Sequence, residues 1–302
     1  MAFVHSDFLR LANPPGSTRA EQAYQQIKNA VVGNSAFADI TFDTYLQGSY
    51  LNSTNVKEDS DIDVVLELTS SFCGRTSHLS ALEQSWYQIA YPSSATYTWE
   101  LFKKDVGIVL KRQFGDANVD IGNKAIKVKG NAGRLNADVV PTITYKNFNS
   151  FTMLNKEDFV SGIAFWTSDG TMMTNYPKIH KENGIRKNHQ NRTYGKYKDF
   201  VRIFKRIRGE LADLSLIQME DVPSYSVECL IYNVPDNLFV GDYKSTFLYI
   251  TDFILRHPNL STFFTVSHQH HLFGTMQHQW KPEKARNFIR LADAWYKVKN
   301  GS

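Results

Sequence analysis

The sequence predicts an α+β fold with two lobes: a sheet-containing lobe over residues 1–150 and a helical lobe over residues 151–302. Alternation of apolar and polar residues, typical of strands, recurs in the first half. An apolar stripe of helical period lies in the second half. The 302 residues are 42% hydrophobic, which is enough to bury a core in both lobes, and we expect the lobes to share that core.

The first lobe begins with a helix signal. Thr18 and Glu21 have the spacing of a capping box, and the apolar residues that follow recur at helical intervals. This N-terminal helix is a candidate bridge to the second lobe. From Ile40 to Leu46 the period changes to two, which predicts a half-buried strand that Gly48 interrupts.

Four further runs rich in Ile, Val and Leu are predicted to be strands of the first lobe. They cover residues 62–68, 106–112, 124–129 and 135–140. The run at 62–68 is nearly continuous and is broken only by acids. Together with the strand at 40–46, these runs indicate a small mixed sheet.

The pattern becomes helical after about Thr152. The clearest case is the stretch 197–214, in which seven apolar residues form one stripe of period 3.6. Two later helices are expected at about 244–256 and 282–298. The second lobe is therefore predicted to be built from helices.

Composition excludes several classes of protein. Charged residues make up 21% of the chain, so it is neither a disordered tail nor a small disulfide scaffold. There is no run of 18 uncharged apolar residues, and the N-terminus lacks a basic region followed by a hydrophobic one. Cys73 and Cys229 stand far apart in apolar settings, which favours a reducing compartment. We expect a cytoplasmic protein with no membrane partner.

Charge is distributed unevenly along the chain. The formal net charge is +4, but residues 1–150 carry −1 and residues 151–302 carry +5. Between Lys178 and Arg208 there are eleven basic residues against two acids, a net charge of +9. Such a block is typical of a phosphate-facing surface or of a solvated helix face, and composition does not separate the two.

Asp61 and Asp63 form the most informative pair of acids. On a strand, residues i and i+2 share a face, so the two carboxylates project together while Ile62 points to the other side. Two such carboxylates repel each other unless cations neutralise them, and oxygen ligands favour Mg²⁺ or Mn²⁺ over zinc. The alternative is a strand end with solvated acids.

Gly48 and Ser49 stand upstream of this pair. The glycine lets backbone approach a ligand, the serine supplies a hydroxyl, and backbone N–H groups can hold a triphosphate; a plain turn is the alternative. A two-metal site needs ligands on both sides of two cations that lie about 3.5–4 Å apart, so a third carboxylate is required. Asp138, an acid among apolar neighbours, is the best candidate, whereas Asp116 and Asp120 fit a solvated loop.

These residues resemble the nucleotidyltransferase signature of the DNA polymerase β superfamily. The string 48–63 is similar to that of the bacterial cGAS/DncV-like nucleotidyltransferases (CD-NTases), especially clade E. Further resemblance lies at 137–141, 176–184, 201–208 and 223–235, and in the terminal region from Trp280 to Trp295. The resemblance implies a polymerase β-like lobe packed against a helical lobe, in the bilobed arrangement of the OAS and cGAS enzymes.

The resemblance also implies an activity. A member of this family joins nucleoside triphosphates, such as ATP and UTP, into a cyclic oligonucleotide and releases pyrophosphate. The product acts on a separate effector in CBASS antiphage defence, and clade E favours a pyrimidine-containing cyclic dinucleotide. The two cysteines cannot build the zinc ribbon of the animal relatives, so no obligate nucleic-acid activator is expected, and the chain is expected to be monomeric and bacterial.

Roles for single residues follow from the same resemblance. The carboxylates of Asp61, Asp63 and Asp138 would bind two Mg²⁺ ions, with Mn²⁺ as a substitute. The donor triphosphate would be contacted by Ser49, beside Gly48, and by Lys205 and Ser224, while Tyr225 would stack on a nucleobase. Lys205 stands within the apolar stripe of its helix, and a buried lysine needs an anion.

There are alternative interpretations of base recognition and of the overall function. Asn183 is a candidate for reading a base edge, because an amide offers both a donor and an acceptor, and Asn175 is its rival. A second function is template-independent transfer of a nucleotide to an RNA end or another acceptor, or synthesis of linear oligonucleotides. A third is a catalytically inactive homologue that only binds. The charge distribution favours triphosphates held between the lobes over a bound duplex.

Overall fold

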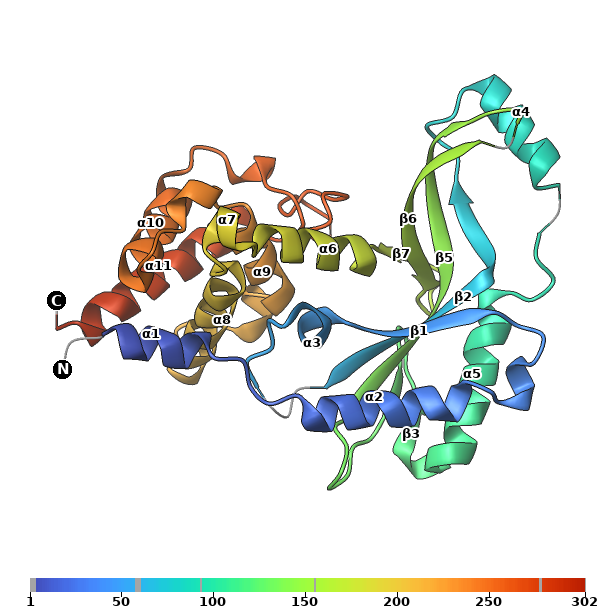
Figure 1. Cartoon of the computed structure of the whole chain (residues 1–302), viewed down its shortest axis with the longest axis horizontal. Coiled ribbons are helices and arrows are strands. Elements are labelled where there is room, and N and C mark those ends of the chain that lie inside the picture. Colours follow the sequence, from blue (N-terminus) through green and yellow to red (C-terminus); the bar gives the residue numbers. More distant parts are fainter. Residues whose placement is uncertain (1–3, 58–60, 93, 155, 277–278, 302) are drawn as a thin grey trace. The chain divides into compact units, whose positions relative to one another are not determined.

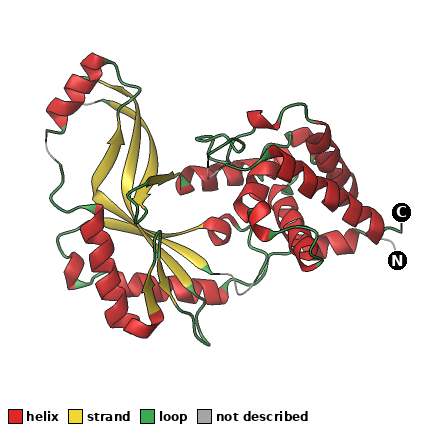
Figure 2. Ribbon diagram, turned by 180° about the vertical axis from the view of Figure 1, so that it is seen from behind, coloured by secondary structure: helices red, strands yellow, loops and turns green. Residues whose placement is uncertain are grey.

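The computed structural model describes residues 4–57, 61–92, 94–154, 156–276 and 279–301. Its contacts divide the chain into two compact units. One, here called the sheet unit, comprises Gly16–Tyr50 and Asp59–Pro177; the other, the helical unit, comprises Met1–Pro15, Leu51–Glu58 and Lys178–Ser302. Strands occur only in the first unit among the described residues, as Figure 2 shows in yellow.

The described part of the sheet unit contains one mixed seven-stranded sheet. The strands are β1 (Phe42–Gln47), β2 (Ile62–Arg75), β3 (Val119–Ile121), β4 (Ile126–Val128), β5 (Ala137–Phe151), β6 (Glu157–Trp166) and β7 (Met172–Asn175). Their order is β1-β2-β5-β4-β3, with β6 on the far part of β5 and β7 on β6. Only β2 and β5 run parallel, and the other pairs are antiparallel. The predicted α+β class with a mixed sheet is therefore confirmed.

Helices cover this sheet. They are α2 (Thr18–Val31), α4 (Ala81–Ala90) and α5 (Trp99–Phe114), and the short α3 (Gly48–Asn52) directly follows β1. α2 and α5 pack against the sheet and against each other, while α4 lies at the far end of β5 (Figure 1). Ile62, Val64 and Leu66 of β2 have no exposed surface, which explains the nearly continuous apolar run.

Residues 106–112 are not a strand, so that prediction was wrong. They form the second half of α5, which Thr98 caps by accepting a hydrogen bond from the backbone of Leu101. The apolar residues of the run belong to a longer helical stripe that begins at Trp99. A short apolar run alone does not distinguish a strand from a buried helix segment. The two are distinguished by the length of the whole element, which includes the flanking residues.

The sheet extends further along the chain than expected. β6 and β7 follow Thr152, where helices were predicted, so the helical pattern begins only at α6 (Pro177–Lys187). The units accordingly meet in sequence near residue 177, later than the expected boundary at 150. The physical reason is the pairing of β6 with the second half of β5, which completes the sheet before the chain turns helical.

The capping box predicted for the N-terminal helix is absent. α2 begins at Thr18, after Ser17, and no side chain caps it. A separate helix, α1 (His5–Ala12), precedes it and belongs to the helical unit. Phe8 of α1 is almost fully buried there, with its ring 5.9 Å from the ring of Phe247.

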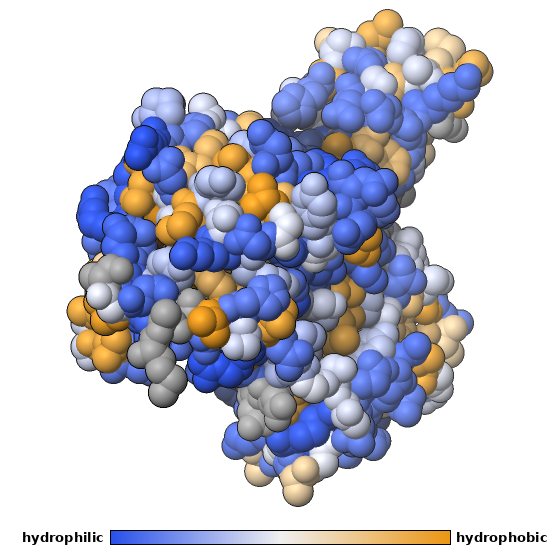
Figure 3. Space-filling model, turned by 60° about the vertical axis from the view of Figure 1, so that its left-hand side comes forward, coloured by the Kyte–Doolittle hydropathy of each residue, from blue (hydrophilic) through white to orange (hydrophobic). Residues whose placement is uncertain are grey.

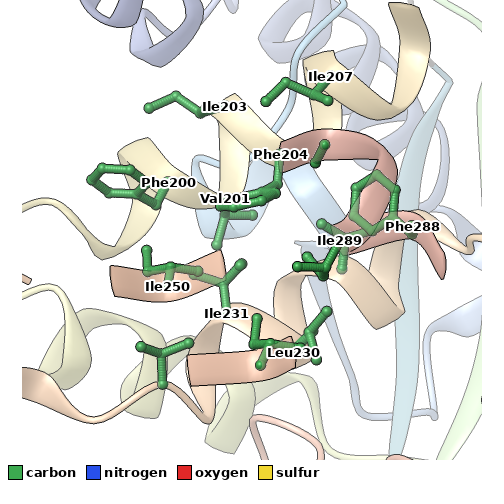
Figure 4. Close-up of a cluster of buried hydrophobic side chains, with 14 of the residues drawn as sticks. Phe200, Val201, Ile203, Phe204, Ile207, Leu230, Ile231, Ile250, Phe288 and Ile289 are labelled. Carbon is green, nitrogen blue, oxygen red and sulfur yellow. The ribbon is translucent and has the colours of Figure 1, made fainter. Parts of the chain in front are cut away.

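The helical unit is assembled around one long helix. Its helices are α1, α6, α7 (Gln190–Thr193), α8 (Tyr197–Asp213), α9 (Ser224–Tyr232), α10 (Tyr243–Arg256) and α11 (Pro282–Lys299). Six of the seven apolar residues of the expected stripe lie on the buried face of α8, whereas Leu214 follows the helix and is exposed. Figure 4 shows Phe204 among side chains of α9, α10 and α11. Burying each such side chain contributes about 1.5–3 kcal/mol. The predicted helices near 244–256 and 282–298 are confirmed as α10 and α11.

The surface carries no extended apolar face in the view of Figure 3. Hydrophilic residues predominate there, and hydrophobic residues form small, separate patches. Within the described ranges, the longest apolar stretches of helix fall short of what a membrane crossing requires.

Candidate active site

Asp63 and Asp138 are brought together by strand register. β2 and β5 pair in parallel, and the Cα atoms of these two residues are direct partners across the pair. Partners in neighbouring strands have their side chains on the same face of the sheet. Asp63 and Asp138 belong to a row of register partners across the sheet. This register row continues on both sides, because Gln47 pairs with Asp63 and Lys127 of β4 pairs with Asp138.

Asp61 stands at the entry to β2. Its Oδ1 accepts a hydrogen bond of 3.0 Å from the side-chain amide of Asn136, which precedes β5. The other end of the same amide accepts a bond from the Gly130 backbone at 2.7 Å. Asn136 therefore fixes the orientation of the Asp61 carboxylate. The three residues before Asp61, which are Glu58, Asp59 and Ser60, lie outside the described residues.

Gly48 is required by its contact with Asp63. Its φ is +68°, in the left-handed region that side chains disfavour. A Cβ at this position would stand 2.5 Å from Oδ2 of Asp63, closer than any normal contact. The loop that starts with Gly48-Ser49 therefore begins directly against one of the three acids. Ser49 lies in α3, directly after β1, and is partly exposed.

The acids influence one another electrostatically. Burial, followed by the charges of Asp138 and Asp61, raises the pKa of Asp63 to about 6. Burial also raises the pKa of Asp138; Lys127 opposes this shift and Asp61 adds to it. In the metal-free chain the fold thus works against ionisation of Asp63 and Asp138.

The donor set suits a hard divalent cation. Three carboxylates offer oxygen ligands only, which Mg²⁺ and Mn²⁺ prefer. Among the described residues no three His, Cys, Asp or Glu side chains are grouped closely enough to hold a metal ion, so the fit of the three acids rests on their ligand chemistry. Burial, together with the charges of Asp138 and Asp61, disfavours ionisation of Asp63, and a bound cation would favour its ionised form. The residues present therefore fit the expected ion in chemistry and in charge.

Lys205 has a different environment from the one expected. Its ammonium lies 3.1 Å from Oε2 of Glu228, 3.1 Å from the hydroxyl of Thr54 and 3.2 Å from the carbonyl of Thr54. An ammonium has three donors, and each has a partner here. In this structure the anion beside Lys205 is thus a carboxylate of the protein, and the expected contact between Lys205 and a triphosphate stays a prediction.

Most cations of the basic block between Lys178 and Arg208 have partners within the helical unit. Of its eleven cations, all within described segments, at least seven bond to backbone carbonyls or carboxylates of the helical unit. These are Lys187, Arg192, Lys196, Arg202, Lys205, Arg206 and Arg208. Most of the +9 charge therefore holds the helical unit together.

Ser224 and Tyr225 begin α9. Ser224 is exposed, and Tyr225 keeps 51% of its surface accessible. The ring of Tyr225 lies 5.6 Å from that of the buried His180, at 37°. One face of the tyrosine is thus supported from within the unit, which leaves exposed surface for a planar ligand.

The two asparagine candidates differ in how accessible their side-chain amides are to a ligand. The side-chain amide of Asn183 in α6 donates to the Val266 carbonyl at 2.8 Å, so one of its two N–H donors is occupied. Asn175 is the last residue of β7 and is exposed. The geometry leaves the amide of Asn175 accessible, which favours it over Asn183.

Several residues of the candidate site were missed in the sequence. Lys127 and Asp120 continue the register row on β4 and β3, although Asp120 had been assigned to a solvated loop. The alternation of Ile126 and Val128 about Lys127 was the available signal. No local pattern pointed to Glu228 and Thr54, which bond across 174 positions.

Comparison with known proteins places this arrangement among nucleotidyltransferases. Residues 182–297 match the family model of the cGAS/DncV-like nucleotidyltransferase C-terminal helical domain. The cyclic UMP-AMP synthase of Rhodothermus marinus is 35% identical over 294 residues, 97% of each chain. The structure of the R. marinus CdnE c-UMP-AMP synthase with Apcpp and Upnpp superposes with a TM-score of 0.87, covering 98% of this chain and 97% of that one.

Two further relatives show similar agreement. The cyclic nucleotide synthase CdnE01 of Staphylococcus haemolyticus is 39% identical over 251 residues, 82% of each chain. The cyclic dipurine nucleotide synthase of Elizabethkingia meningoseptica is 32% identical over 247 residues, again 82% of each chain. A structure of that organism's CdnE with GTP and Apcpp is 28% identical, covers 97% of this chain and 98% of that one, and has a TM-score of 0.77. Relatives of comparable similarity thus carry names with different bases.

Replacing Gly48 by Ala is expected to cost more stability than replacing Gly33, which also has a positive φ of +77° but has nothing within 4 Å of its Cβ position. Both variants should lose about 1–2 kcal/mol to backbone strain. Gly48→Ala should lose about 1–3 kcal/mol more by overlap with Asp63. Urea unfolding measures the difference. The excess should disappear in Gly48→Ala/Asp63→Ala, and its persistence there would contradict the assigned contact.

Asp63→Asn should stabilise the metal-free chain at high pH. The pKa of Asp63 rises from 3.8 to about 6 on folding, so its ionised form disfavours the fold above about pH 6 and has no effect below about pH 4. A shift of this size corresponds to about 2–3 kcal/mol. The gain in unfolding free energy should be complete at about pH 8 and vanish as the pH falls from about 6 to 4.

Urea unfolding of parent and variant across this pH range measures the effect. Asp213→Asn, which replaces an exposed acid at the end of α8, is the control. Equal stability of parent and Asp63→Asn at the high-pH end would show that burial and the neighbouring acids do not raise the pKa of Asp63 in the folded chain.

Proposed function

The chain belongs to the cGAS/DncV-like nucleotidyltransferases, and on this basis we propose that it joins nucleoside triphosphates into a cyclic oligonucleotide and releases pyrophosphate. A cyclic dinucleotide that contains a pyrimidine is the proposed product, as named for the R. marinus relative. The single observation that carries the proposal is the pairing of Asp63 with Asp138, with Gly48 set against Asp63.

Asp61, Asp63 and Asp138 are the proposed ligands of two Mg²⁺ ions. When bound, Mg²⁺ would supply the positive charge that lowers the pKa of a ribose hydroxyl and neutralises the phosphates. Lys127, the register partner of Asp138, would favour the ionised form of this ligand, and Asn136 would hold Asp61 in one orientation. Together these neighbours keep the acids ready to bind.

The proposed reaction forms one phosphodiester bond at a time. The oxygen of a ribose hydroxyl on one nucleotide bonds to the α-phosphorus of the other, the bond from that phosphorus to pyrophosphate breaks, and the hydroxyl proton is released to water. Asp138 is proposed to stand beside the attacking hydroxyl. A second transfer in the opposite sense closes the ring and releases a second pyrophosphate. The chain's contribution is to orient both nucleotides, which can supply most of the rate.

The proposed contacts to the nucleotides are Ser49, Lys205, Ser224 and Tyr225. The hydroxyl of Ser49 would donate to the donor triphosphate, beside backbone that Gly48 keeps free of side chain. Ser224 is exposed at the first position of α9, where backbone N–H groups are unpaired. Tyr225 would stack on a base, supported by the neighbouring ring of His180.

The biological setting follows the family. We propose that the product acts on a separate CBASS effector in a bacterial cytoplasm, that the chain works as a monomer, and that ATP and UTP are the first substrates to test. Transfer of single nucleotides to an RNA end or another acceptor, or synthesis of linear oligonucleotides, is the alternative that the same carboxylates would serve.

Incubation of the chain with mixed NTPs and Mg²⁺, followed by phosphatase and mass spectrometry, tests the proposal. We expect a phosphatase-resistant product without free ends. Asp61→Asn, Asp63→Asn and Asp138→Asn should each lower turnover by about 10²-fold or more, because each removes an anionic ligand with little change of size. Circular dichroism serves as the control for folding. Products that are only linear or acceptor-linked would favour the alternative.

Asn175→Ser is expected to change base choice. A pair of hydrogen bonds to a base edge is worth about 1–3 kcal/mol, so the ratio of pyrimidine to purine in the product should fall about tenfold. Asn183→Ser is the matched variant. It should leave the ratio unchanged, because the Asn183 amide already donates to the Val266 carbonyl. The ratio is read from the masses of the products, and a shift in Asn183→Ser alone would reverse the assignment.

A further inference from the structure

Lys127 lies in the register row that contains two of the three proposed metal ligands. From β1 to β3 the row consists of Gln47, Asp63, Asp138, Lys127 and Asp120. All five residues belong to the sheet unit, and neighbouring strands of a sheet are about 4.8 Å apart. Side chains of register partners share one face of the sheet, so the side chain of Lys127 lies beside that of Asp138.

The opposite face of the β3-β4 hairpin packs against α5. A Cβ added to Gly107 of α5 would stand 2.9 Å from Cδ1 of Ile121 and 3.8 Å from Cδ1 of Ile126. Ile126 has no exposed surface, whereas Lys127 is exposed. Because successive residues of a strand point to opposite faces, the packing of Ile126 against α5 directs Lys127 to the face that carries the acids.

The ammonium of Lys127 is free to bind a ligand. It has no hydrogen-bond or ion-pair partner within the part of the chain that the structure describes. Lys103 and Lys129, by contrast, donate to backbone carbonyls beside β3 at 2.8 to 3.3 Å. Burial raises the pKa of Asp138 and the charge of Lys127 lowers it, so the cation acts on this acid without bonding to it. A positive charge that the fold directs to the site and leaves unbonded is available to an anion.

The register row has a donor end and an acceptor end in the proposed reaction. Gln47 is followed directly by Gly48-Ser49, the proposed contact of the donor triphosphate, and Gly48 lies against Asp63. In phosphoryl transfer the attacking and leaving oxygens lie roughly in line through the phosphorus. Pyrophosphate would leave toward Gly48-Ser49, so the attacking hydroxyl would approach from the end of the row at Asp138. Lys127, the next residue beyond Asp138, is therefore on the side of the acceptor nucleotide.

The phosphates are the anionic groups of an acceptor nucleotide, since its base and ribose are uncharged. A lysine ammonium binds phosphate as a compact point charge, and its flexible stem lets it follow a phosphate that changes position. In the first transfer the acceptor carries the triphosphate of an NTP. In the second transfer the attacking nucleotide carries the phosphodiester that has just formed. One lysine at this place can therefore serve both steps.

We propose that Lys127 is a further catalytic residue, which binds the phosphates of the acceptor nucleotide while the ribose hydroxyl of that nucleotide attacks. This inference rests on the proposed function. It assigns to Lys127 a direct contact with substrate in addition to its effect on Asp138. A hydrogen bond between an ammonium and a phosphate is worth about 10- to 100-fold in affinity.

Two NTP analogues separate the acceptor from the donor in the kinetic test. An α,β-methylene NTP keeps its ribose hydroxyls but cannot release pyrophosphate, so it can only accept. A 2′,3′-dideoxy NTP has no ribose hydroxyl to attack with, so it can only donate. The pair can form only one linear dinucleotide, which mass spectrometry quantifies. Varying each analogue in turn gives a separate KM for the acceptor and for the donor.

Lys127→Met should raise KM for the acceptor about 10- to 100-fold and change KM for the donor less than about threefold. Lys127→Arg keeps the positive charge and should lose less than Lys127→Met. Lys124→Met is the matched control, because Lys124 is an exposed lysine between β3 and β4 and lies off the register row. It should resemble the parent.

Three results would overturn the proposal. One is an unchanged acceptor KM in Lys127→Met, and another is an increase confined to the donor KM. The third is a variant that only requires more Mg²⁺ for half-maximal rate, because Lys127 would then act on Asp138 alone.

Reductive methylation of lysines gives a readout that does not depend on turnover. The parent chain is labelled with Mg²⁺ alone and with Mg²⁺ plus the α,β-methylene NTP, and mass spectrometry measures the modification of each lysine. The nucleotide should protect Lys127 and leave Lys124 reactive. Equal labelling of Lys127 in both samples would contradict the proposal. A parent chain that forms no product from ordinary NTPs would contradict the proposed function, whereas the labelling still decides whether Lys127 binds nucleotide.

Discussion

The pairing of Asp63 with Asp138 on adjacent parallel strands is the constraint on which the site depends. Parallel register places the two carboxylates side by side, and burial raises the pKa of both. The surrounding structure accommodates this cost: Gly48 makes room at Asp63, Asn136 orients Asp61, and Lys127 partly offsets the charge at Asp138. A sheet that buries carboxylates beside one another offers oxygen ligands only, and such a site is suited to a divalent cation and the phosphates that it brings.

Positive charge serves a different purpose in the helical unit. Most cations of the block from Lys178 to Arg208 bond to carbonyls and carboxylates around α8, so they determine where loops and helices lie. Lys205 and Glu228 are the most buried example. Removing either partner of such a pair leaves an uncompensated charge, which is why loss of activity on mutating Lys205 would not by itself identify a phosphate ligand.

Sequence reasoning succeeded where the signal was local. The strand at 62–68, the stripe of α8 and the helices near 244–256 and 282–298 follow from periodicity, and the motif from Gly48 to Asp63 follows from spacing. It failed at residues 106–112, because a short apolar run fits two structures, and at β6, because its pairing with β5 is a tertiary contact. The bonds between Thr54 and Glu228 span 174 positions, so no local pattern could reveal that Lys205 already has its anion.

Anomalous diffraction from crystals grown with Mn²⁺ and a non-hydrolysable NTP tests the central claim, that Asp61, Asp63 and Asp138 together hold the catalytic cations. Mn²⁺ takes the same oxygen ligands as Mg²⁺ and is visible by its anomalous signal. The account predicts Mn²⁺ peaks bonded to these three carboxylates and to the triphosphate, at about 2.0–2.3 Å from the oxygens. Mn²⁺ bound elsewhere, or a triphosphate bound with none of the three acids in contact with metal, would contradict it.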